Sequence, residues 1–459
     1  MPLIKSISGF RGTIGGRPGD NLTPQDIVEC TAAFGQWIIE TTGNPKIVVG
    51  RDGRISGEIV SALVVNTLRS IGISVVDLGL STTPTVEIAV PIEKAGGGII
   101  LTASHNPREW NALKLLNQKG EFISAADGAA VLAHVAAGNI EYAPVGQLGT
   151  YETNDTYIHR HIDLILALPL VDIPAIQAKK FKVVVDAVNS TGALAVPPLL
   201  EALGCTVILL NGEINGQFAH NPEPLKEHLH QLSSAVKMQK AQLGIAVDPD
   251  VDRLVFMCED GELFGEEYTL VAVADYVLSQ RSGGNTVSNL SSTRALNDVT
   301  RKYGGQYFAA AVGEVNVVEK MKAVAAVIGG EGNGGVILPE LHYGRDALVG
   351  IALFLTHLAR SGKQISTLRK TYPEYQMAKT KIDRAPDLDL EKIFLSLREK
   401  YRNEQINTED GLKIDFESGW VHLRPSNTEP IIRIYSESNS SVIAENLARK
   451  IMQDIQELR

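Results

Sequence analysis

The sequence has little cysteine, no long apolar run and no excess of positive charge. Among its 459 residues are only three cysteines, Cys30, Cys205 and Cys258. Their wide spacing excludes a disulfide framework and a cysteine metal site, so we expect reduced thiols in the core. No stretch approaches eighteen apolar residues and the first residues lack an apolar signal core, which predicts a cytoplasmic protein with no membrane partner.

The charge of the chain limits its partners. The formal net charge is −10 at pH 7, and this argues against a nucleic-acid partner because such proteins need a basic face. Small anionic substrates remain compatible, since a few cationic side chains can converge locally. Apolar residues make up 44% and charged residues 21%, as in soluble globular proteins, and the length indicates three or four domains.

Apolar strands and helical segments alternate in the same order three times. In each round a late strand runs into an unusual loop: 98–101 into 102–107, 243–247 into 248–253, and 325–329 into 330–335. This alternation predicts three similar α/β domains with mostly parallel sheets, and ligands bind beyond the carboxyl ends of such strands.

The remainder of the chain has a different pattern. It indicates an α+β domain, with helices near 390–401 and 442–458 and strands around 413–416, 420–423 and 431–435. We place the four domains at residues 1–148, 149–254, 255–368 and 369–459.

The first unusual loop reads Thr102-Ala-Ser-His-Asn-Pro107. Small residues leave Ser104 accessible on a tight loop, but a serine is a weak nucleophile without a base or a metal. No G-x-S-x-G elbow surrounds it, which argues against an esterase. Taken alone, these residues are also typical of an ordinary capped turn.

The second loop, Asp248-Pro-Asp-Val-Asp-Arg253, places three carboxylates at alternate positions after an apolar strand. They repel one another unless a cation neutralises them, and oxygen ligands suit Mg²⁺ or Ca²⁺. An EF-hand is excluded because Arg253 stands where that loop needs glycine. A solvated acidic turn remains open, as does an aspartyl-phosphate phosphotransferase, although its downstream paired-aspartate motif is missing.

The other two loops are less specific. Gly330-Glu-Gly-Asn-Gly-Gly335 contains neither a P-loop nor a dinucleotide pattern and alone indicates a flexible turn. Arg424-Pro-Ser-Asn-Thr-Glu-Pro430 offers a guanidinium, two hydroxyls and an amide, the donors that suit a phosphate dianion. A surface turn explains it equally well.

In this order the four loops resemble those of the α-D-phosphohexomutase superfamily, over essentially the whole chain. The resemblance implies three similar α/β domains and a fourth α+β domain around a central cleft. It also implies interconversion of hexose 6-phosphate and hexose 1-phosphate through a phosphoserine, with Mg²⁺ and a hexose 1,6-bisphosphate as intermediate and activator. Bacterial phosphoglucosamine mutases are the most similar members; phosphomannomutase or phosphoglucomutase activity is the alternative, and a non-catalytic sugar-phosphate-binding relative is a remoter one.

The resemblance also implies a role for single residues. Ser104 would be the phosphoserine and would ligate the metal together with Asp248, Asp250 and Asp252. The catalytic set would be completed by Lys114 (general acid/base), Arg11, Arg253 and His105, and the sugar phosphate would contact Glu331, Asn333, Arg424, Ser426, Asn427 and Thr428. Burial among cations is one way to lower the pKa of Lys114 toward neutrality.

Two positions of the loop at residues 330–335, the sugar loop of the family, depart from the family pattern. Asn333 stands in place of a serine and Gly335 in place of a histidine, so a family acid/base is missing. His342 and Arg345 are the nearby candidates to compensate. The residues leave the preferred hexose and the oligomeric state open.

Overall fold

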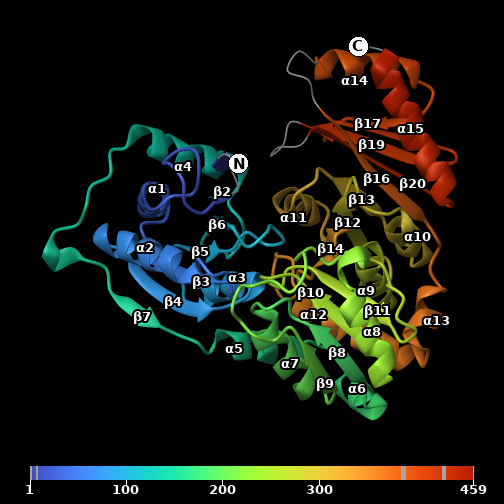
Figure 1. The fold of residues 1–459 in the computed structure, drawn as a ribbon, viewed down its shortest axis with the longest axis horizontal. Coiled ribbons are helices and arrows are strands. Elements are labelled where there is room, and N and C mark those ends of the chain that lie inside the picture. The colour runs from blue at the N-terminus through green and yellow to red at the C-terminus, as the bar shows by residue number, and fades with distance from the viewer. Residues whose placement is uncertain (1–2, 7–8, 384–388, 426–430, 458–459) are drawn as a thin grey trace.

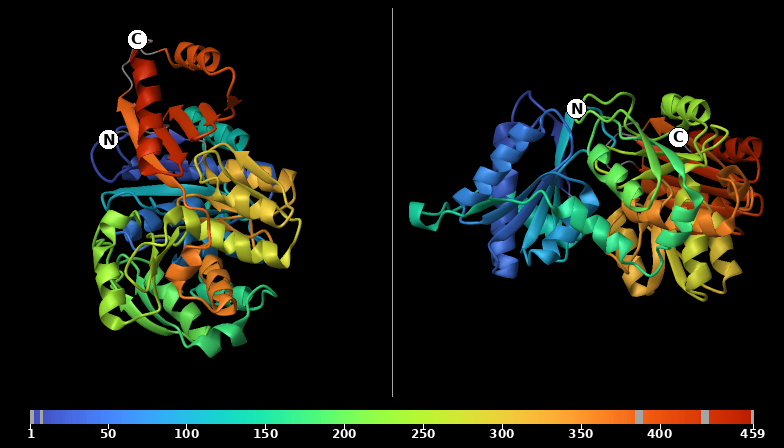
Figure 2. Two further views of the ribbon diagram at one scale, coloured as in Figure 1. Left: turned by 90° about the vertical axis from the view of Figure 1, so that its right-hand side faces the viewer. Right: turned by 90° about the horizontal axis from the view of Figure 1, so that it is seen from below.

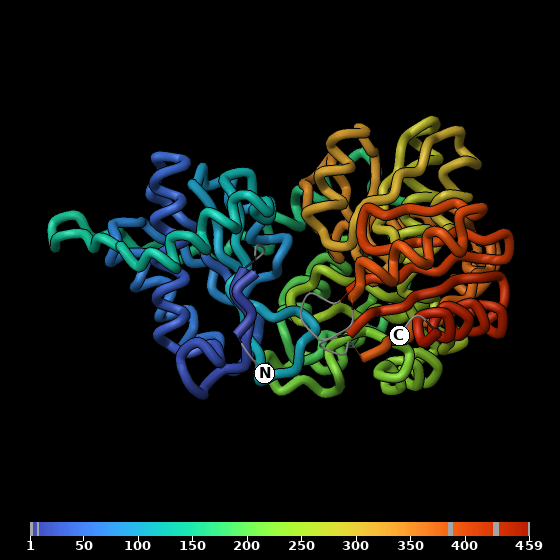
Figure 3. Tube along the Cα trace, turned by 90° about the horizontal axis from the view of Figure 1, so that it is seen from above, coloured from blue at the N-terminus to red at the C-terminus, as the bar shows by residue number. Residues whose placement is uncertain are grey.

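A computed structural model describes residues 3–6, 9–383, 389–425 and 431–457. Four sheets follow one another along the chain and form two lobes (Figures 1 and 2). The first sheet and its helices make one lobe, and the other three sheets make the second lobe, as the view from above in Figure 3 shows. Within the described ranges, no helix is both long and apolar enough to cross a membrane.

The first lobe is built on a seven-stranded sheet. Its strand order is β1 (Ile4–Ser6), β2 (Gly9–Thr13), β6 (Trp110–Leu116), β5 (Gly97–Leu101), β3 (Lys46–Arg51), β4 (Ser74–Leu80) and β7 (Tyr151–Thr153). The helices are α1 (Pro24–Thr42), α2 (Gly57–Ser70), α3 (Thr83–Ile92) and α4 (Ala125–Ala137), with a short 3₁₀ turn η1 (Val145–Gln147). Apolar side chains of α1, α2 and α4 cover one face of the sheet and those of α3 cover the other.

Cap chemistry sets the ends of these helices. Thr23 and Asp26 form a capping box at the start of α1, and Gly43 ends it in the left-handed conformation with φ 64°. Ser124 and Asp127 form the same box on α4. The boundaries of these helices therefore follow from local side-chain hydrogen bonds.

The second and third sheets have four strands each. The second has the order β11 (Leu254–Cys258), β10 (Leu243–Val247), β8 (Lys182–Asp186) and β9 (Thr206–Leu210); its helices are α5 (Tyr157–Leu166), α6 (Ile173–Lys179), α7 (Gly192–Ala202) and α8 (His230–Gln239), with the turn η2 (Lys226–His228). The third has the order β13 (Tyr307–Ala310), β12 (Asn285–Asn289), β14 (Ala326–Glu331) and β15 (Gly335–Ile337); its helices are α9 (Glu266–Gln280), α10 (Ala295–Lys302), α11 (Glu314–Ala323), α12 (Ala347–Ser361) and α13 (Ile365–Arg369).

One continuous apolar core joins the second and third sheets. Helix α12 packs against α9 and also against α5 and α6. Phe354 of α12 stacks on Phe256 of β11 with ring centroids 3.7 Å apart. Because the two units share this core, they behave as one body that faces the first lobe. The three cysteines are buried and carry free thiols, as expected.

The fourth sheet is antiparallel, in the order β16 (Gln376–Asp383), β20 (Ile431–Ser438), β19 (Gly419–Pro425), β18 (Leu412–Phe416) and β17 (Gln405–Asn407). Helices α14 (Leu390–Lys400) and α15 (Ser441–Glu457) pack on it through one apolar cluster. The Lys413 ammonium donates to the carbonyl of Leu290 (2.8 Å), which connects this unit to the third. The predicted fold class of three α/β units followed by an α+β unit is confirmed.

Each of the three unusual loops of the α/β units joins two antiparallel strands. The pairs are β5–β6, β10–β11 and β14–β15. The sequence predicted mostly parallel sheets, and it did not predict an antiparallel partner after each loop. A short loop can only return the chain in the antiparallel direction, because a parallel neighbour needs a long crossover.

Candidate active site

The serine loop (residues 102–107) is held by a buried arginine, Arg54, which lies between β3 and α2. The Arg54 guanidinium pairs with Asp52 (Nε to Oδ2 3.0 Å) and donates to four carbonyl oxygens around Ser104, those of Ser104, Asn106, Pro107 and Trp110, at 2.5–2.9 Å. Asp52 also accepts from Thr102 Oγ1 (2.6 Å). A planar five-donor guanidinium suits such a set of acceptors, and its contacts hold the loop in one shape.

Ser104 adopts an unusual backbone conformation within this loop. Its φ is 49°, in the left-handed region that non-glycine residues rarely occupy. Its amide donates to Thr102 Oγ1 (2.9 Å), and its hydroxyl donates to Asp248 Oδ2 (2.7 Å) on the other lobe. The strained loop therefore directs the Ser104 hydroxyl across the boundary between the lobes toward the acidic loop.

The acidic loop (residues 248–253), which follows β10, is compact and buried. Val251 has φ 63°, an outlier for a β-branched residue, and its amide bonds the carbonyl of Asp248 (3.1 Å). The backbone amides of Asp252 and Arg253 donate to Asp248 Oδ1 (3.2 and 3.1 Å). This turn brings carboxylate oxygens of Asp248, Asp250 and Asp252 within 4.8 Å of one another.

The charges of these three aspartates are not fully balanced by the protein. Burial, followed by the charges of Asp252 and Asp250, raises the pKa of Asp248 well above its usual range. Within the described residues, Asp250 Oδ1 and Asp252 Oδ1 are buried without a hydrogen-bond partner. Buried carboxylate oxygens normally have partners, and a cluster of oxygen ligands fits a hard divalent cation. The three aspartates could therefore hold such an ion.

Lys114 lies beside the acidic loop, and its pKa shifts in the direction opposite to the expected one. Its ammonium is 2.8 Å from Asp250 Oδ2 and 3.6 Å from Asp252 Oδ2. Burial lowers the pKa of Lys114, but the two carboxylates outweigh burial and raise the pKa above its ordinary value. The expectation of a lowered pKa was wrong because the lysine is buried among anions. Lys114 is held charged, as a hydrogen-bond donor.

Three further predicted catalytic side chains surround Ser104. His105 Nδ1 is 3.5 Å from Ser104 Oγ, and burial together with the charges of Arg253 and Arg11 lowers its pKa well below the usual value. Arg11 on β2 donates to Asn106 Oδ1 (3.0 Å). Arg253 lies 4.0 Å from Asp252 Oδ1 and 3.5 Å from Glu223. The structure thus brings all five predicted catalytic residues to the junction of the serine and acidic loops.

The sugar loop meets the acidic loop at the same place. The amide of Leu254 donates to the carbonyl of Gly334 (3.1 Å). Glu331 accepts from Asn289 Nδ2 (2.8 Å) and from the amide of Gly313 (3.1 Å), and it pairs with Arg345 (2.7 Å). Burial would raise the pKa of Glu331, but Arg345, the hydrogen bonds from Asn289 and Gly313 and the charge of Arg253 together lower the pKa. Among the described residues, the Asn333 side chain accepts only the local hydrogen bond from the Gly335 amide (3.2 Å), which closes the turn.

The structure describes only residues 424 and 425 of the proposed phosphate loop (residues 424–430). Arg424 forms an ion pair with Asp410 (Nε to Oδ2 3.0 Å), and the same carboxylate oxygen accepts from the amide of Val312 (3.0 Å). The next amide, that of Gly313, is a donor to Glu331. Arg424 is thereby connected to the sugar loop. The predicted ligands Ser426, Asn427 and Thr428 lie outside the described residues.

Sequence reasoning missed several residues of this site. No role was predicted for Asp52 and Arg54, nor for Thr83, whose hydroxyl donates to Asp250 Oδ2 (2.6 Å). Glu314 at the start of α11, bound to Arg345, was also missed. A charged Arg-Asp-Gly-Arg run directly after a buried strand was an available signal for Arg54; Thr83 and Glu314 carried none.

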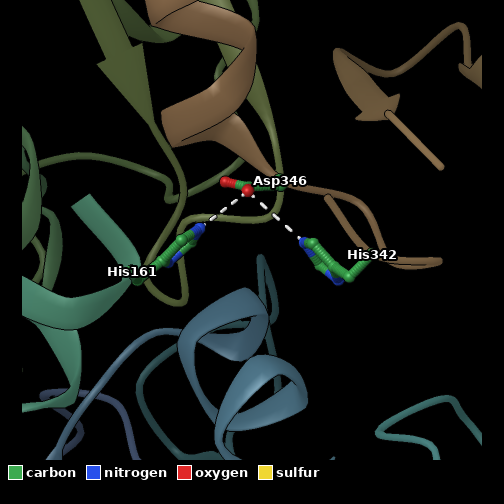
Figure 4. Close-up of side chains that lie close together, drawn as sticks. All are labelled: His161, His342 and Asp346. Carbon is green, nitrogen blue, oxygen red and sulfur yellow. Dashed lines mark hydrogen bonds and ion pairs between the residues drawn. The ribbon is translucent and has the colours of Figure 1, made fainter. Parts of the chain in front are cut away.

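A second buried cluster of possible metal ligands lies where the three α/β units meet. His161 of α5 and His342 both direct Nε2 at Asp346 Oδ2, at 2.9 and 3.3 Å (Figure 4). His161 Nδ1 meets Thr85 Oγ1 (3.0 Å), and His342 Nδ1 lies 3.3 Å from Glu87 of α3. The other oxygen of Asp346 caps α12 through the amides of Leu348 and Val349. Each polar atom of Asp346 therefore has a protein partner.

Comparison with known proteins decides the family. The four domain models of the phosphoglucomutase/phosphomannomutase family match in order: alpha/beta/alpha domain I over residues 4–140, domain II over 159–261, domain III over 265–375, and the C-terminal domain over 381–453. The chain belongs to this family. Its members are phosphohexomutases, which are isomerases.

Individual relatives of this family match nearly the whole chain. A phosphoglucomutase/phosphomannomutase of Thermococcus kodakarensis is 37% identical over 94% of each chain. A phosphoglucosamine/phosphogalactosamine mutase of Sulfurisphaera tokodaii is 32% identical over 98% of each. The crystal structure of a phosphoglucomutase/phosphomannomutase family protein from Burkholderia thailandensis superposes with a TM-score of 0.86 at 26% identity, covering 99% of this chain and 97% of that one.

Proposed function

We propose that the protein is a cytoplasmic phosphohexomutase that uses a phosphoserine at Ser104 and prefers glucosamine phosphate. The observation that carries the serine assignment is its geometry. Ser104 has a strained φ of 49°, and its hydroxyl contacts Asp248 at 2.7 Å, within a cluster of three buried carboxylates. An exposed serine on an ordinary turn has no reason to adopt this arrangement.

The metal of this proposal is Mg²⁺, held by Asp248, Asp250 and Asp252 together with the Ser104 phosphate. The unpartnered oxygens of Asp250 and Asp252 support the assignment. When bound, such an ion offsets negative charge on a transferring phosphoryl group. Arg253 and the charged Lys114 would add to that effect from the protein side.

The proposed reaction moves a phosphate twice. A sugar hydroxyl attacks the phosphorus of phosphoserine, so a P–O bond to the sugar forms and the bond to Ser104 Oγ breaks. The proton of the hydroxyl passes through a side chain to Ser104 Oγ, and for this relay we propose His105, because its lowered pKa keeps it neutral whereas Lys114 is held charged and can only donate. The bisphosphosugar then turns and returns its other phosphate to Ser104 by the reverse step, so phosphate and proton are conserved.

Substrate binding in this proposal is divided between two loops. Glu331 accepts hydrogen bonds from sugar hydroxyls, and Arg424 with Ser426, Asn427 and Thr428 grips the phosphate that is not transferring. The predicted domains 1–148, 149–254, 255–368 and 369–459 would each supply one loop. A hexose 1,6-bisphosphate would activate the enzyme by phosphorylating Ser104.

The preferred sugar rests on the sugar loop and on the relatives. The Gly-Glu-Gly-Asn-Gly-Gly loop and the hexosamine mutase of Sulfurisphaera tokodaii favour glucosamine phosphate. The alternative is a phosphoglucomutase/phosphomannomutase, favoured by the relative of that name at 37% identity. Coupled assays on glucosamine, mannose and glucose 6-phosphates decide between them, and we expect the highest kcat/KM for glucosamine 6-phosphate.

The phosphate carrier is tested by locating the covalent phosphate. Protein incubated with a hexose bisphosphate should hold acid-stable phosphate on the peptide containing residues 102–107. Ser104→Ala should stay folded and lose several orders of magnitude in kcat, because the covalent route is removed. A hydroxylamine-labile phosphate on Asp248 or Asp250 would instead identify an aspartyl-phosphate enzyme.

A further inference from the structure

Arg345 is the residue that connects the acidic loop with the sugar loop. Its guanidinium contacts Asp252 (2.6 Å), Glu331 (2.7 Å) and Glu314 (3.0 Å) with three different nitrogens, and the side chain is almost completely buried. These three carboxylates come from the loop after β10, the end of β14 and the start of α11. One cation therefore sets the relative positions of a proposed metal ligand and a proposed sugar ligand.

Gly335 leaves the space through which Arg345 reaches this position. Gly335 pairs with Glu331 across the β14–β15 hairpin, so a side chain at 335 would point to the same face as Glu331. A Cβ at residue 335 would lie 2.4 Å from Arg345 Cδ and 3.1 Å from Cγ, closer than real contacts allow. The arginine stem therefore occupies the volume of the missing side chain at position 335.

The residues that follow Arg345 are held by hydrogen bonds. The amide of Asp346 donates to the carbonyl of Val336 (2.8 Å), and the amide of Ala347 donates to the carbonyl of Val251 in the acidic loop (3.2 Å). The Asp346 carboxylate is fixed by two histidines and by the first turn of α12 (Figure 4). The Arg345 side chain thus extends from a backbone that is hydrogen-bonded to the acidic loop and to β15.

We propose that Arg345 is a positioning residue that replaces the side chain absent at Gly335: it holds Glu331 for the sugar and ties Asp252 to the sugar loop. The proposal rests on the proposed function for its sugar half only. Arg345 acts through Glu331 and Asp252, and it competes with a cation for Asp252. Its loss therefore has opposite effects at the two loops.

The two effects distinguish positioning from general damage. In Arg345→Gln, Glu331 loses its partner and the KM for glucosamine 6-phosphate should rise about tenfold, the usual effect of removing one charged hydrogen bond. Mg²⁺ binding to the sugar-free protein should become several-fold tighter, because a positive charge 2.6 Å from Asp252 is gone. Arg345→Lys should recover the Mg²⁺ affinity of the wild type but little of the KM, because an ammonium cannot span three carboxylates.

Isothermal titration with MgCl₂ and steady-state kinetics measure the two halves separately. Arg360→Lys is the control, because Arg360 pairs with Asp172 (2.8 Å) outside these loops and should change neither quantity. Weaker Mg²⁺ binding together with a higher KM, or no change in either, would overturn the proposal. Wild-type protein that turns over none of the hexose phosphates contradicts the proposed function, and the MgCl₂ titration still decides the contact with Asp252.

A double-mutant cycle tests the shared volume. Gly335→Ala should displace Arg345 and raise KM about as much as Arg345→Ala does, and the double variant should be no worse than either single one. Additive effects of the two substitutions would show that residue 335 and Arg345 act independently. Thermal unfolding of each variant checks that the fold is kept.

Discussion

Two buried carboxylate clusters lie close to the boundary between the lobes and differ in how their charge is balanced. In the acidic loop, Asp250 and Asp252 each keep one oxygen without a hydrogen-bond partner among the described residues. In the junction cluster of His161, His342 and Asp346, one oxygen of Asp346 meets both histidines and the other caps α12. The first cluster has unpartnered carboxylate oxygens that could bind a cation, and the second already pairs its carboxylate with the charged His342.

The difference shows what distinguishes a ligand site from a structural charge. A buried carboxylate with all its lone pairs used contributes to the fold, and removing one partner leaves the other uncompensated. A buried carboxylate oxygen without a hydrogen-bond partner is energetically unfavourable in the empty site. Binding of a cation to that oxygen removes this cost, so such a site favours cation binding. Proximity of ligand atoms alone does not separate the two, since both clusters meet that criterion.

The largest expected effect comes from removing one charge of the acidic loop. Asp250→Asn should raise the Mg²⁺ concentration needed for activity more than about 100-fold, because a direct ligand is at least as sensitive as the partners of ligands. Asp346→Asn is the matched control: asparagine still caps α12, and the Mg²⁺ requirement should stay at the wild-type value. Equal shifts in both variants, measured as activity against free Mg²⁺, would contradict the difference between the clusters.

A buried arginine, Arg54, extends the comparison to positive charge. Arg54 has its donors used by Asp52 and four carbonyls, so its role is to shape the serine loop. Arg54→Lys keeps the charge but cannot reach four acceptors, and kcat should fall about 100-fold as Ser104 shifts. Phosphoserine content should fall with kcat, whereas Arg360→Lys should keep both. Full kcat in Arg54→Lys would show that β-strand pairing alone holds the loop.

Much of the fold was predictable because the apolar strands are strongly patterned. The strand at 243–247 was predicted with the bounds that the structure has, and the strands at 98–101 and 325–329 differ from the observed ones by one or two residues at an end. The returning strand β6 was missed because Asn111 and Lys114 interrupt its apolar pattern, although both are buried. Their polar atoms are satisfied by Ser56 and Asp250, partners that lie far away in the sequence. Local patterns contain no information about such contacts.

The site was predictable where function requires a fixed order of residues. Ser104 and the three aspartates stand in short motifs, and the structure brings them together across 144 residues of chain. The direction of the Lys114 pKa shift was not predictable, because it depends on whether anions or cations surround the ammonium in space. Arg345 belongs to the same class: its proposed role follows from the space that Gly335 leaves for the arginine side chain, which appears only in three dimensions.

A smaller effect is expected at the phosphate loop. Arg424 is proposed to hold the non-transferring phosphate, so Arg424→Ala should raise KM about tenfold and only then reduce kcat. Arg424→Lys should also be impaired, because a planar bidentate contact is lost. Activity should become more dependent on added sugar bisphosphate while Ser104 stays phosphorylated. A wild-type KM with unchanged bisphosphate dependence would show that residues 424–430 form only a surface turn.

The smallest effect, on stability alone, is expected at the junction cluster. Burial lowers the pKa of His342, but Asp346 and Glu87 outweigh it and raise the pKa to about 10. Burial and the charge of Glu314 raise the pKa of Glu87 to about 8, although His342 and Lys114 act in the opposite direction and lower it. Both groups therefore keep protons in the folded protein that the unfolded chain has lost. The contribution of Glu87 to the free energy of unfolding is complete below pH 4.5 and disappears as the pH rises through 8. The contribution of His342 is complete below pH 6.5 and disappears as the pH rises through 10.

Replacing His342 should flatten this pH dependence without changing the chemistry. The melting temperature of the wild type should fall between pH 6.5 and pH 10, and in His342→Gln it should start roughly 5 °C lower and fall less. Glu87→Gln is the matched variant on α3: it keeps a hydrogen-bond acceptor for His342 but removes the titrating carboxyl, so it should lose only the Glu87 part of the slope. The Mg²⁺ requirement should be unchanged in both variants. A wild-type slope in His342→Gln would mean that other groups titrate, and a changed Mg²⁺ requirement would mean that the junction cluster, like the acidic loop, serves the metal.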